Sequence, residues 1–249
     1  MLGYMQDDKY MWTISEFKEK AKYILTKCCY WKAVLVGFIF ILVGGLSSGG
    51  GSSAGYAAGS FSSITFEGAD PAVTAIFVGI FLAVFAVILT FVFVFTAFVT
   101  NPIVVGCNRF FCMACISDTD VGEIGFAFNN GRYMNIVKAM FSVFIEVFLW
   151  SLLLVIPGIV KGYEYRMVPY ILSEHPFMSG AQAKELSREM MNGEKMNAFI
   201  MDISFIGWYI LSACTCGILM IFWTAPYVCL TNAQLYLALK NKIVSINPY

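Results

Sequence analysis

Five charged side chains and one amide interrupt segments that are otherwise strongly apolar. They are Glu146, Lys161, Glu164, Arg166, Asp202 and Asn232. Because lipid solvates ionised groups badly, such side chains face the interior of a helix bundle or an aqueous cavity. They could line a path for a ligand or ion, or they could form structural ion pairs that hold short helices together. The sequence favours neither interpretation over the other.

The spacing of these residues predicts which of them pair. Lys161 and Glu164 are three residues apart, so they can pair along one helix. Glu146 lies eleven residues before Pro157, and Arg166 lies nine residues after it. If the chain turns back at this proline, the two side chains reach a similar height. We therefore expect Arg166 to pair with Glu146, or otherwise with Asp202.

The other reactive residue types form no comparable set. Cys107, Cys112 and Cys115 have the spacing of plant-type iron–sulfur proteins, but no fourth ligand is apparent. All eight cysteines lie in or beside apolar runs, where cysteine acts as a small buried hydrophobe. His175, the one histidine, lies in a loop without an identifiable nucleophile or third partner. We expect no metal, no cofactor and no enzymatic activity.

The composition is that of a helical membrane protein. Hydrophobic residues make up 59% of the 249 residues and charged residues 13%, whereas a soluble domain has about 25% charged residues. The formal net charge is zero, and the basic residues form no nucleic-acid footprint. The expected partners are membrane lipids, and partner membrane proteins or a second copy of the chain, but not nucleic acid.

The whole sequence, 1–249, is predicted to form one all-α membrane domain. Proline and glycine residues divide it into about six transmembrane helices. The expected spans are 32–46, 71–100, 134–156, 159–172, 197–223 and 228–239. The expected helix breaks, which leave some of these helices short, are Pro102, Pro157, Gly158 and Pro226. The segment 103–116 stays ambiguous, because the repeat described below predicts that it crosses and the charges predict that it does not.

Three further segments have a composition of their own. Residues 1–31 are an amphipathic lead, in which 13–28 predict a helix that lies on the membrane surface or packs on the protein itself. Residues 47–70 predict a Gly/Ser-rich outer loop. Ser179 and Gln182 form a capping box that opens an interfacial or cytoplasmic amphipathic helix.

An internal repeat is predicted, with units at about 118–172 and 179–240. Its clearest sign is a pair of hexapeptides that match at four of six positions, Asn130-Gly131-Arg132-Tyr133-Met134-Asn135 and Asn192-Gly193-Glu194-Lys195-Met196-Asn197. Each hexapeptide follows a short capped helix and precedes a long span that ends at a proline. This shared order favours duplication of a parallel unit.

The distribution of basic residues predicts the sidedness. With six crossings, all of the 16 Lys and Arg residues except Lys161 and Arg166 fall on one side of the membrane. Cytoplasmic segments are enriched in Lys and Arg. Both termini and the helix within 174–196 are therefore expected on the cytoplasmic side of a multi-pass protein.

The second half of the chain resembles the bacterial membrane family known as domain of unknown function 975. The resemblance rests on Ile156-Pro157-Gly158-Ile159-Val160-Lys161-Gly162-Tyr163-Glu164-Tyr165-Arg166, continuing to Leu172, and on Ser187–Gly193, Ser204–Trp208 and Pro226-Tyr227. That family is similar, more distantly, to the membrane domain of some glycerophosphodiester phosphodiesterases. The resemblance implies a bacterial plasma-membrane protein with several spans, and it supplies no catalytic residues.

Two functions follow as hypotheses. The first is a non-catalytic membrane module that binds lipid or a partner protein in an export or envelope process. The alternative is a small transporter or channel whose path runs along the intramembrane charges. A water-filled cavity that reaches the charges would favour transport, whereas a closed and fully paired cluster would favour the module.

Overall fold

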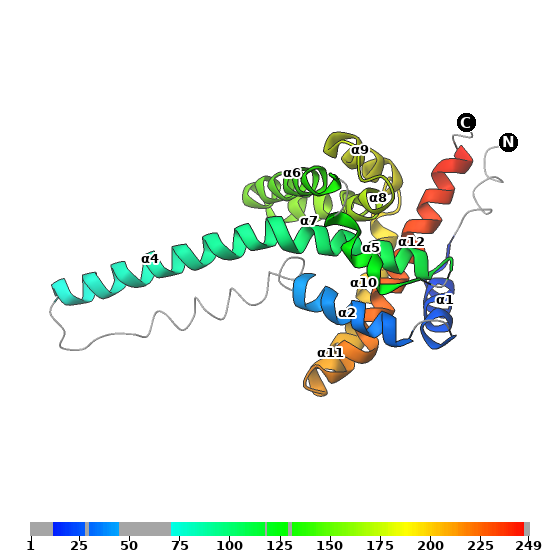
Figure 1. Ribbon diagram of the computed structural model, residues 1–249, viewed down its shortest axis with the longest axis horizontal. Helices are drawn as coiled ribbons and strands as arrows, with labels where there is room; N and C mark the ends of the chain where they lie inside the picture. Colours follow the sequence, from blue (N-terminus) through cyan, green and yellow to red (C-terminus); the bar gives the residue numbers. More distant parts are fainter. Residues whose placement is uncertain (1–11, 28–29, 45–70, 118, 129–130, 247–249) are drawn as a thin grey trace.

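The computed structural model describes residues 12–27, 30–44, 71–117, 119–128 and 131–246, and every regular element in these ranges is helical (Figure 1). The predicted all-α class is therefore confirmed. The predicted 47–70 loop and the first eleven residues of the amphipathic lead lie outside the described residues.

The helices follow one another with short connections. Their bounds are α1 Ile14–Lys27, α2 Tyr30–Gly44, α4 Pro71–Phe95, η1 Thr96–Thr100, α5 Asn101–Ala114, η2 Val121–Phe128, α6 Arg132–Leu153, α7 Val155–Glu164, α8 Val168–Glu174, α9 Gly180–Met190, α10 Lys195–Ile203, α11 Ile206–Cys214, η3 Met220–Thr224 and α12 Ala225–Ile246. The elements η1 and η3 are π-helical turns, and η2 is a 3-10 helix.

Several described helices are long and apolar enough to cross a membrane. They are Ile76–Ala114, Arg132–Leu153 and Lys195–Cys214, with a fourth if α1 and α2 count as one bent span. This supports a membrane protein, but it does not establish six crossings. The predicted span 159–172 is divided between α7 and α8, which have 10 and 7 residues. The predicted span 197–223 turns at Cys216 and Gly217, whose φ angles are 51° and 83°.

Pro102 does not end its helix, contrary to the prediction, because a neighbouring side chain replaces the missing backbone contact. The chain runs from α4 through η1 into α5, where Pro102 occupies the first turn. A proline removes the hydrogen bond to the carbonyl four residues earlier, here that of Phe98. The hydroxyl of Tyr133 donates to this carbonyl oxygen at 2.7 Å.

Pro226 is accommodated in the same way. It lies in the first turn of α12, directly after η3. The carbonyl four residues earlier belongs to Phe222 and accepts a hydrogen bond from the hydroxyl of Tyr30 at 3.3 Å. Both prolines thus follow a π-turn, and both leave a carbonyl that a tyrosine satisfies.

The break predicted at Pro157 and Gly158 lies instead at Leu154, whose extended backbone (φ −157°, ψ 137°) separates α6 from α7. Pro157 is the third residue of α7, where a helix tolerates proline. Gly158 allows α7 to approach α6, because a Cβ at this position would lie 2.7 Å from the Cα of Ser151. The two helices therefore form a tight hairpin.

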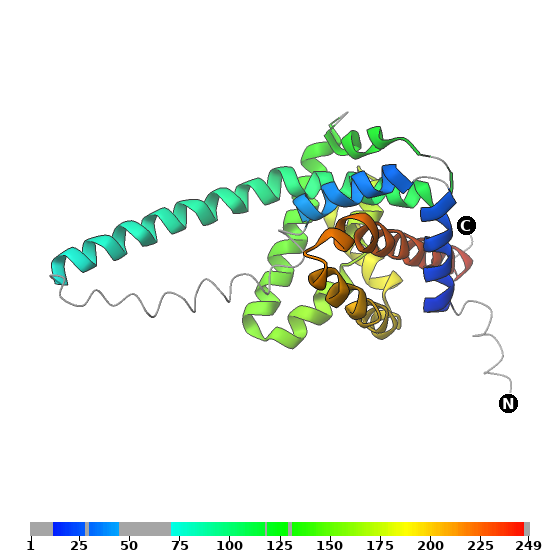
Figure 2. The ribbon, with the colours of Figure 1, turned by 90° about the horizontal axis from the view of Figure 1, so that it is seen from below.

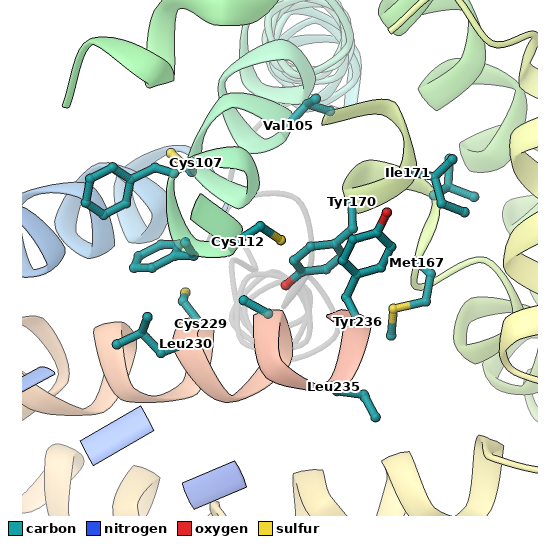
Figure 3. Packing of buried hydrophobic residues seen from close by; sticks show 14 of the residues in the cluster. Val105, Cys107, Cys112, Met167, Tyr170, Ile171, Cys229, Leu230, Leu235 and Tyr236 are labelled. Carbon is teal, nitrogen blue, oxygen red and sulfur yellow. The ribbon is translucent and has the colours of Figure 1, made fainter. Parts of the chain in front are cut away.

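The core lies where α5, α8 and α12 meet (Figure 3). The ring of Tyr170 from α8 stacks on that of Tyr236 from α12, with the ring centroids 5.4 Å apart. Cys107, Cys112 and Cys229 are buried in the same cluster, as expected of small hydrophobes.

The helix α1 packs on the protein itself, which was one of the two predicted alternatives. Its apolar stripe of Phe17, Ala21 and Leu25 is buried. Lys18 lies over the ring of Phe205, with 4.5 Å between its ammonium group and the ring centroid, and its ammonium group donates to the carbonyl of Ser204.

The helix α4 extends away from the rest of the molecule in both views (Figures 1 and 2). Each residue from Ile76 to Phe95 is exposed, whereas nine residues of the continuing α5 are buried. One continuous helix thus changes at η1 from exposed to largely buried.

The proposed repeat units share their opening but differ beyond it. Gly131 and Gly193 have φ angles of 71° and 79° and precede α6 and α10. The first unit turns back at Leu154, directly before α7, whereas the second turns back at Cys216 and Gly217, before η3 and α12. The duplication stays a prediction.

Candidate functional site

The predicted charged residues lie at the base of the α6–α7 hairpin in two neighbouring sets. The first set, called here the Asp202 set, joins the turn after α7 to α10 and α12. Arg166 binds the carboxylate of Asp202 through two hydrogen bonds, Nη1 to Oδ2 and Nη2 to Oδ1, both 2.7 Å long. Such a bidentate pair is stronger and more directional than a single contact. Nη2 of Arg166 also donates to Oδ1 of Asn232 at 2.9 Å, and the hydroxyl of Tyr163 donates to Oδ2 of Asp202 at 2.8 Å.

The expected pairing of Arg166 with Glu146 was wrong, and Asp202 takes its place. The reason is the position of the hairpin turn. Measured from Leu154, Glu146 is eight residues away and Arg166 twelve, so the two side chains differ in height by about 6 Å at 1.5 Å per residue. Arg166 also follows the end of α7, so the turn before α8 carries it towards α10 and α12.

The second set, called here the Glu146–Glu164 set, surrounds two acids with four cations. Glu146 accepts from the ammonium group of Lys184 at 2.9 Å and also accepts a hydrogen bond from the hydroxyl of Tyr165. The same ammonium group donates to the hydroxyl of Ser142 at 3.0 Å. Glu146 thus pairs with the amphipathic helix α9 and lies at its level rather than deep within an apolar layer.

Glu164 is the most enclosed acid of this set, with a side chain 9% exposed. Lys161 lies 2.7 Å from it, which confirms the predicted pair. Lys195 and Arg188 approach its other oxygen at 3.3 and 3.4 Å. Nη2 of Arg188 also donates to the hydroxyl of Tyr165 at 3.3 Å, which connects Glu164 to the surroundings of Glu146.

The sequence did not identify Lys184, Arg188 and Lys195 as members, because they were placed on an amphipathic helix and its connection. The predicted capping box is present, since the backbone amide of Gln182 donates to the hydroxyl of Ser179 and the side chain of Gln182 accepts from the amide of Ser179. Lys184 and Arg188 are one turn apart on the face that reaches α6 and α7. This spacing was the available signal.

Ser187 fixes α9 against the end of α7. Its hydroxyl donates to the carbonyl of Glu164 at 2.7 Å and accepts from the backbone amide of Met167 at 3.2 Å. Ser187 itself is fully buried. The backbone turn that presents Arg166 is therefore held by α9, and the two charged sets share this support.

Two surface hollows lie apart from both sets. One, of about 560 Å³, is lined by residues of α1 together with Cys115 and Gln234. The other, of about 680 Å³, is lined by Glu174, His175 and neighbouring residues. Neither lining includes a residue of the charged sets. In the described ranges, no group of three or more His, Cys, Asp or Glu residues is arranged to hold a metal ion.

The helices and their charge-paired base define an all-helical chain with several apolar helices able to cross a membrane. The chain belongs to the family described as protein of unknown function (DUF975), whose model matches residues 59–242. The more distant likeness to the membrane domain of glycerophosphodiester phosphodiesterases is not shown. No curated protein and no solved structure matches the chain.

Proposed function

We propose that this chain is a non-catalytic membrane module that binds lipid or a partner membrane protein in an export or envelope process. The observation that carries the proposal is the closed pairing of the charged sets. Asp202 uses both oxygens on Arg166, and Glu164 is surrounded by three cations. Groups committed to one another in this way hold helices together, and they are not free to bind a passing solute.

The proposal includes a bacterial plasma-membrane location with both termini and α9 on the cytoplasmic side. Its support is the basic-residue bias of the sequence. This sidedness does not depend on whether the α6–α7 hairpin crosses the membrane completely, because either arrangement leaves both ends of the hairpin on one side. An impermeant thiol reagent on whole cells should label a cysteine at Ser53 and spare one at Ser179. Equal labelling of the two sites would refute the sidedness.

The alternative function is a small transporter or channel. One observation favours it, namely that the side chain of Asp202 is 36% exposed, so that a small cation could reach it. Transport would then require Arg166 to release the carboxylate. The two functions differ in whether ions move through the protein.

A flux measurement on the purified chain in liposomes separates the two functions. We expect proton and potassium conductance equal to that of empty vesicles, and we expect lipid to remain bound in native mass spectrometry after mild detergent extraction. The matched variants are Arg166→Gln with Asp202→Asn, which together remove the central pair, and Lys20→Gln, which removes an exposed pair on α1. If the wild-type chain conducts ions, the double variant Arg166→Gln with Asp202→Asn abolishes this conductance and Lys20→Gln preserves it, transport would be established instead.

A further inference from the structure

The tip of the α6–α7 hairpin is uncharged and largely uncovered. Between Glu146 and Lys161 the sequence contains no Asp, Glu, Lys or Arg. Leu152, Val155 and Ile156 are 77%, 71% and 76% exposed. The turn lies at the edge of the molecule, away from α1 and α12 (Figure 2). A leucine- and isoleucine-rich tip of this kind would be costly in water.

The base of the same hairpin is polar. The amide of Asn135 donates to the carbonyls of Pro176 and Met178, both at 2.7 Å, which attaches the loop before α9 to α6. Gly180, at the start of α9, packs on Ala139, since a Cβ there would lie 3.0 Å from the Cα of that residue. Lys184 then reaches Glu146. The charged helix α9 therefore accompanies α6 at least as far as Glu146.

The uncharged part of the hairpin, between Glu146 and Lys161, is too short to cross a bilayer. From Glu146 to the turn at Leu154 is eight residues, or about 12 Å of helix, and the return to Lys161 is seven residues, or about 10 Å. The hydrocarbon layer is about 30 Å thick, so one leaflet accounts for about 15 Å of it. The tip matches the depth of a single leaflet.

We propose that the α6–α7 hairpin is re-entrant, so that residues 147–160 insert among the acyl chains of one leaflet and return to the side from which they entered. The inference rests on the proposed membrane function. The cations at the base of the hairpin, Lys161, Lys184 and Arg188, remain at the level of the lipid headgroups. Leu154 does not emerge on the far side.

The test measures the depth of the tip in liposomes by electron paramagnetic resonance. A keto amino acid coupled to a nitroxide replaces Leu152 or Ile156, one on each side of the turn, and leaves the eight native cysteines unchanged. Collision with oxygen and with a water-soluble nickel chelate reports depth. We expect both labels about 8–9 Å deeper than the headgroup-level charges at the base of the hairpin, within the leaflet that α9 faces. A third label at Phe85, in the middle of α4, reports whether the chain is in the bilayer.

The outcomes distinguish the hairpin from the membrane function on which it rests. Labels exposed to water on the far side, with Phe85 buried in lipid, would mean two complete crossings and would overturn the inference alone. Labels exposed to water on the near side, with Phe85 in lipid, would also overturn it. If Phe85 is in water as well, the membrane function fails.

A charge substitution gives an independent readout in cells. A lysine at Leu154 would lie deep in one leaflet if the hairpin is re-entrant, so the amount of membrane-inserted protein should fall about tenfold or more. A lysine at Met134, an exposed residue near the start of α6, should leave it unchanged. Normal insertion of the Leu154→Lys variant would place this residue at the far surface and contradict a re-entrant hairpin.

Discussion

The two charged sets both neutralise carboxylates between packed helices, but they do so with different numbers of contacts. The Asp202 set concentrates its contacts in one bidentate pair that connects a turn, α10 and α12. The Glu146–Glu164 set spreads two acids over four cations from α7, α9 and the start of α10. In the first arrangement the loss of one group leaves its partner without an opposite charge. In the second, the loss of one cation leaves Glu164 with two others or leaves Glu146 with the hydroxyl of Tyr165.

Removal of Arg166 should therefore have the largest effect. Arg166→Ala leaves Asp202 with the hydroxyl of Tyr163 but without its cation, and it frees Asn232. Breaking a buried pair on one side costs about 3–5 kcal/mol. We expect the low end, about 3 kcal/mol, because Asp202 is partly exposed. Thermal unfolding of the detergent-solubilised chain measures the loss. Arg166→Gln combined with Asp202→Asn should recover part of it, and a double variant no more stable than Arg166→Ala would contradict a structural pair.

Removal of the Glu164 charge should have an intermediate effect. Glu164→Gln keeps the shape of the side chain but leaves Lys161, Lys195 and Arg188 without their common acid. Arg188 retains Glu185 at 3.0 Å, so we expect a loss of about 1–2 kcal/mol in the same unfolding measurement. If Glu164→Gln lowered the free energy of unfolding as much as Arg166→Ala, the proposed difference between the Asp202 set and the Glu146–Glu164 set would be contradicted.

Removal of Lys184 should have a smaller effect still. Glu146 keeps the hydroxyl of Tyr165, and both side chains of the pair are partly exposed. Lys184→Met should cost less than about 1 kcal/mol. Added salt should lower the stability of the wild-type chain towards that of the variant, because screening weakens an exposed pair. Unfolding in low and high salt measures the difference, and a gap that salt does not narrow would contradict this explanation.

The smallest effect concerns Glu194, which precedes α10 and pairs with Lys242 near the end of α12. The Asp202 set connects the same two helices. Burial would raise the pKa of its carboxyl, but hydrogen bonds from Lys242 and Asn197 outweigh burial and hold the pKa below its ordinary value of 4.5. A depressed pKa gives stability that is complete above the ordinary value and is lost as the pH falls through the folded value. As the pH falls from neutral into the acid range, the unfolding temperature of Glu194→Gln should decrease less than that of the wild type. Parallel curves of unfolding temperature against pH for the two proteins would exclude a role for this carboxyl.

The sequence predicted what composition and local spacing determine. The all-helical class, the capping box at Ser179 and the Lys161–Glu164 pair each depend on residues close in the chain. The partner of Arg166 was mispredicted because it depends on where the hairpin turns, and proline is an ambiguous marker of a turn. Pro157 is tolerated in the first turn of α7, whereas the break falls at Leu154.

Tertiary contacts account for the other differences. Pro102 and Pro226 do not end their helices because Tyr133 and Tyr30, distant in sequence, supply the missing hydrogen bonds. Lys184 and Arg188 belong to the charged base only because α9 docks on α6 and α7 through Ser187. Spacing within one segment could show that Lys184 and Arg188 share a face of α9, but it could not show which helices that face contacts.

The π-turn at Thr96–Thr100 also sets the rotational phase between α4 and α5. A π-turn contains one residue more than the α-helical pattern, and each residue of an α-helix advances about 100° around its axis. The i→i+5 turn takes up this extra residue locally, so deletion of a single residue here would restore one uninterrupted α-helical pattern and leave α4 in nearly the same rotational phase relative to the buried face of α5. If the same residues formed a regular α-helix without a deletion, α4 would instead be rotated by about 100°. The π-turn thus allows the chain to hold one residue more at this point without turning a different stripe of α4 towards whatever surrounds it.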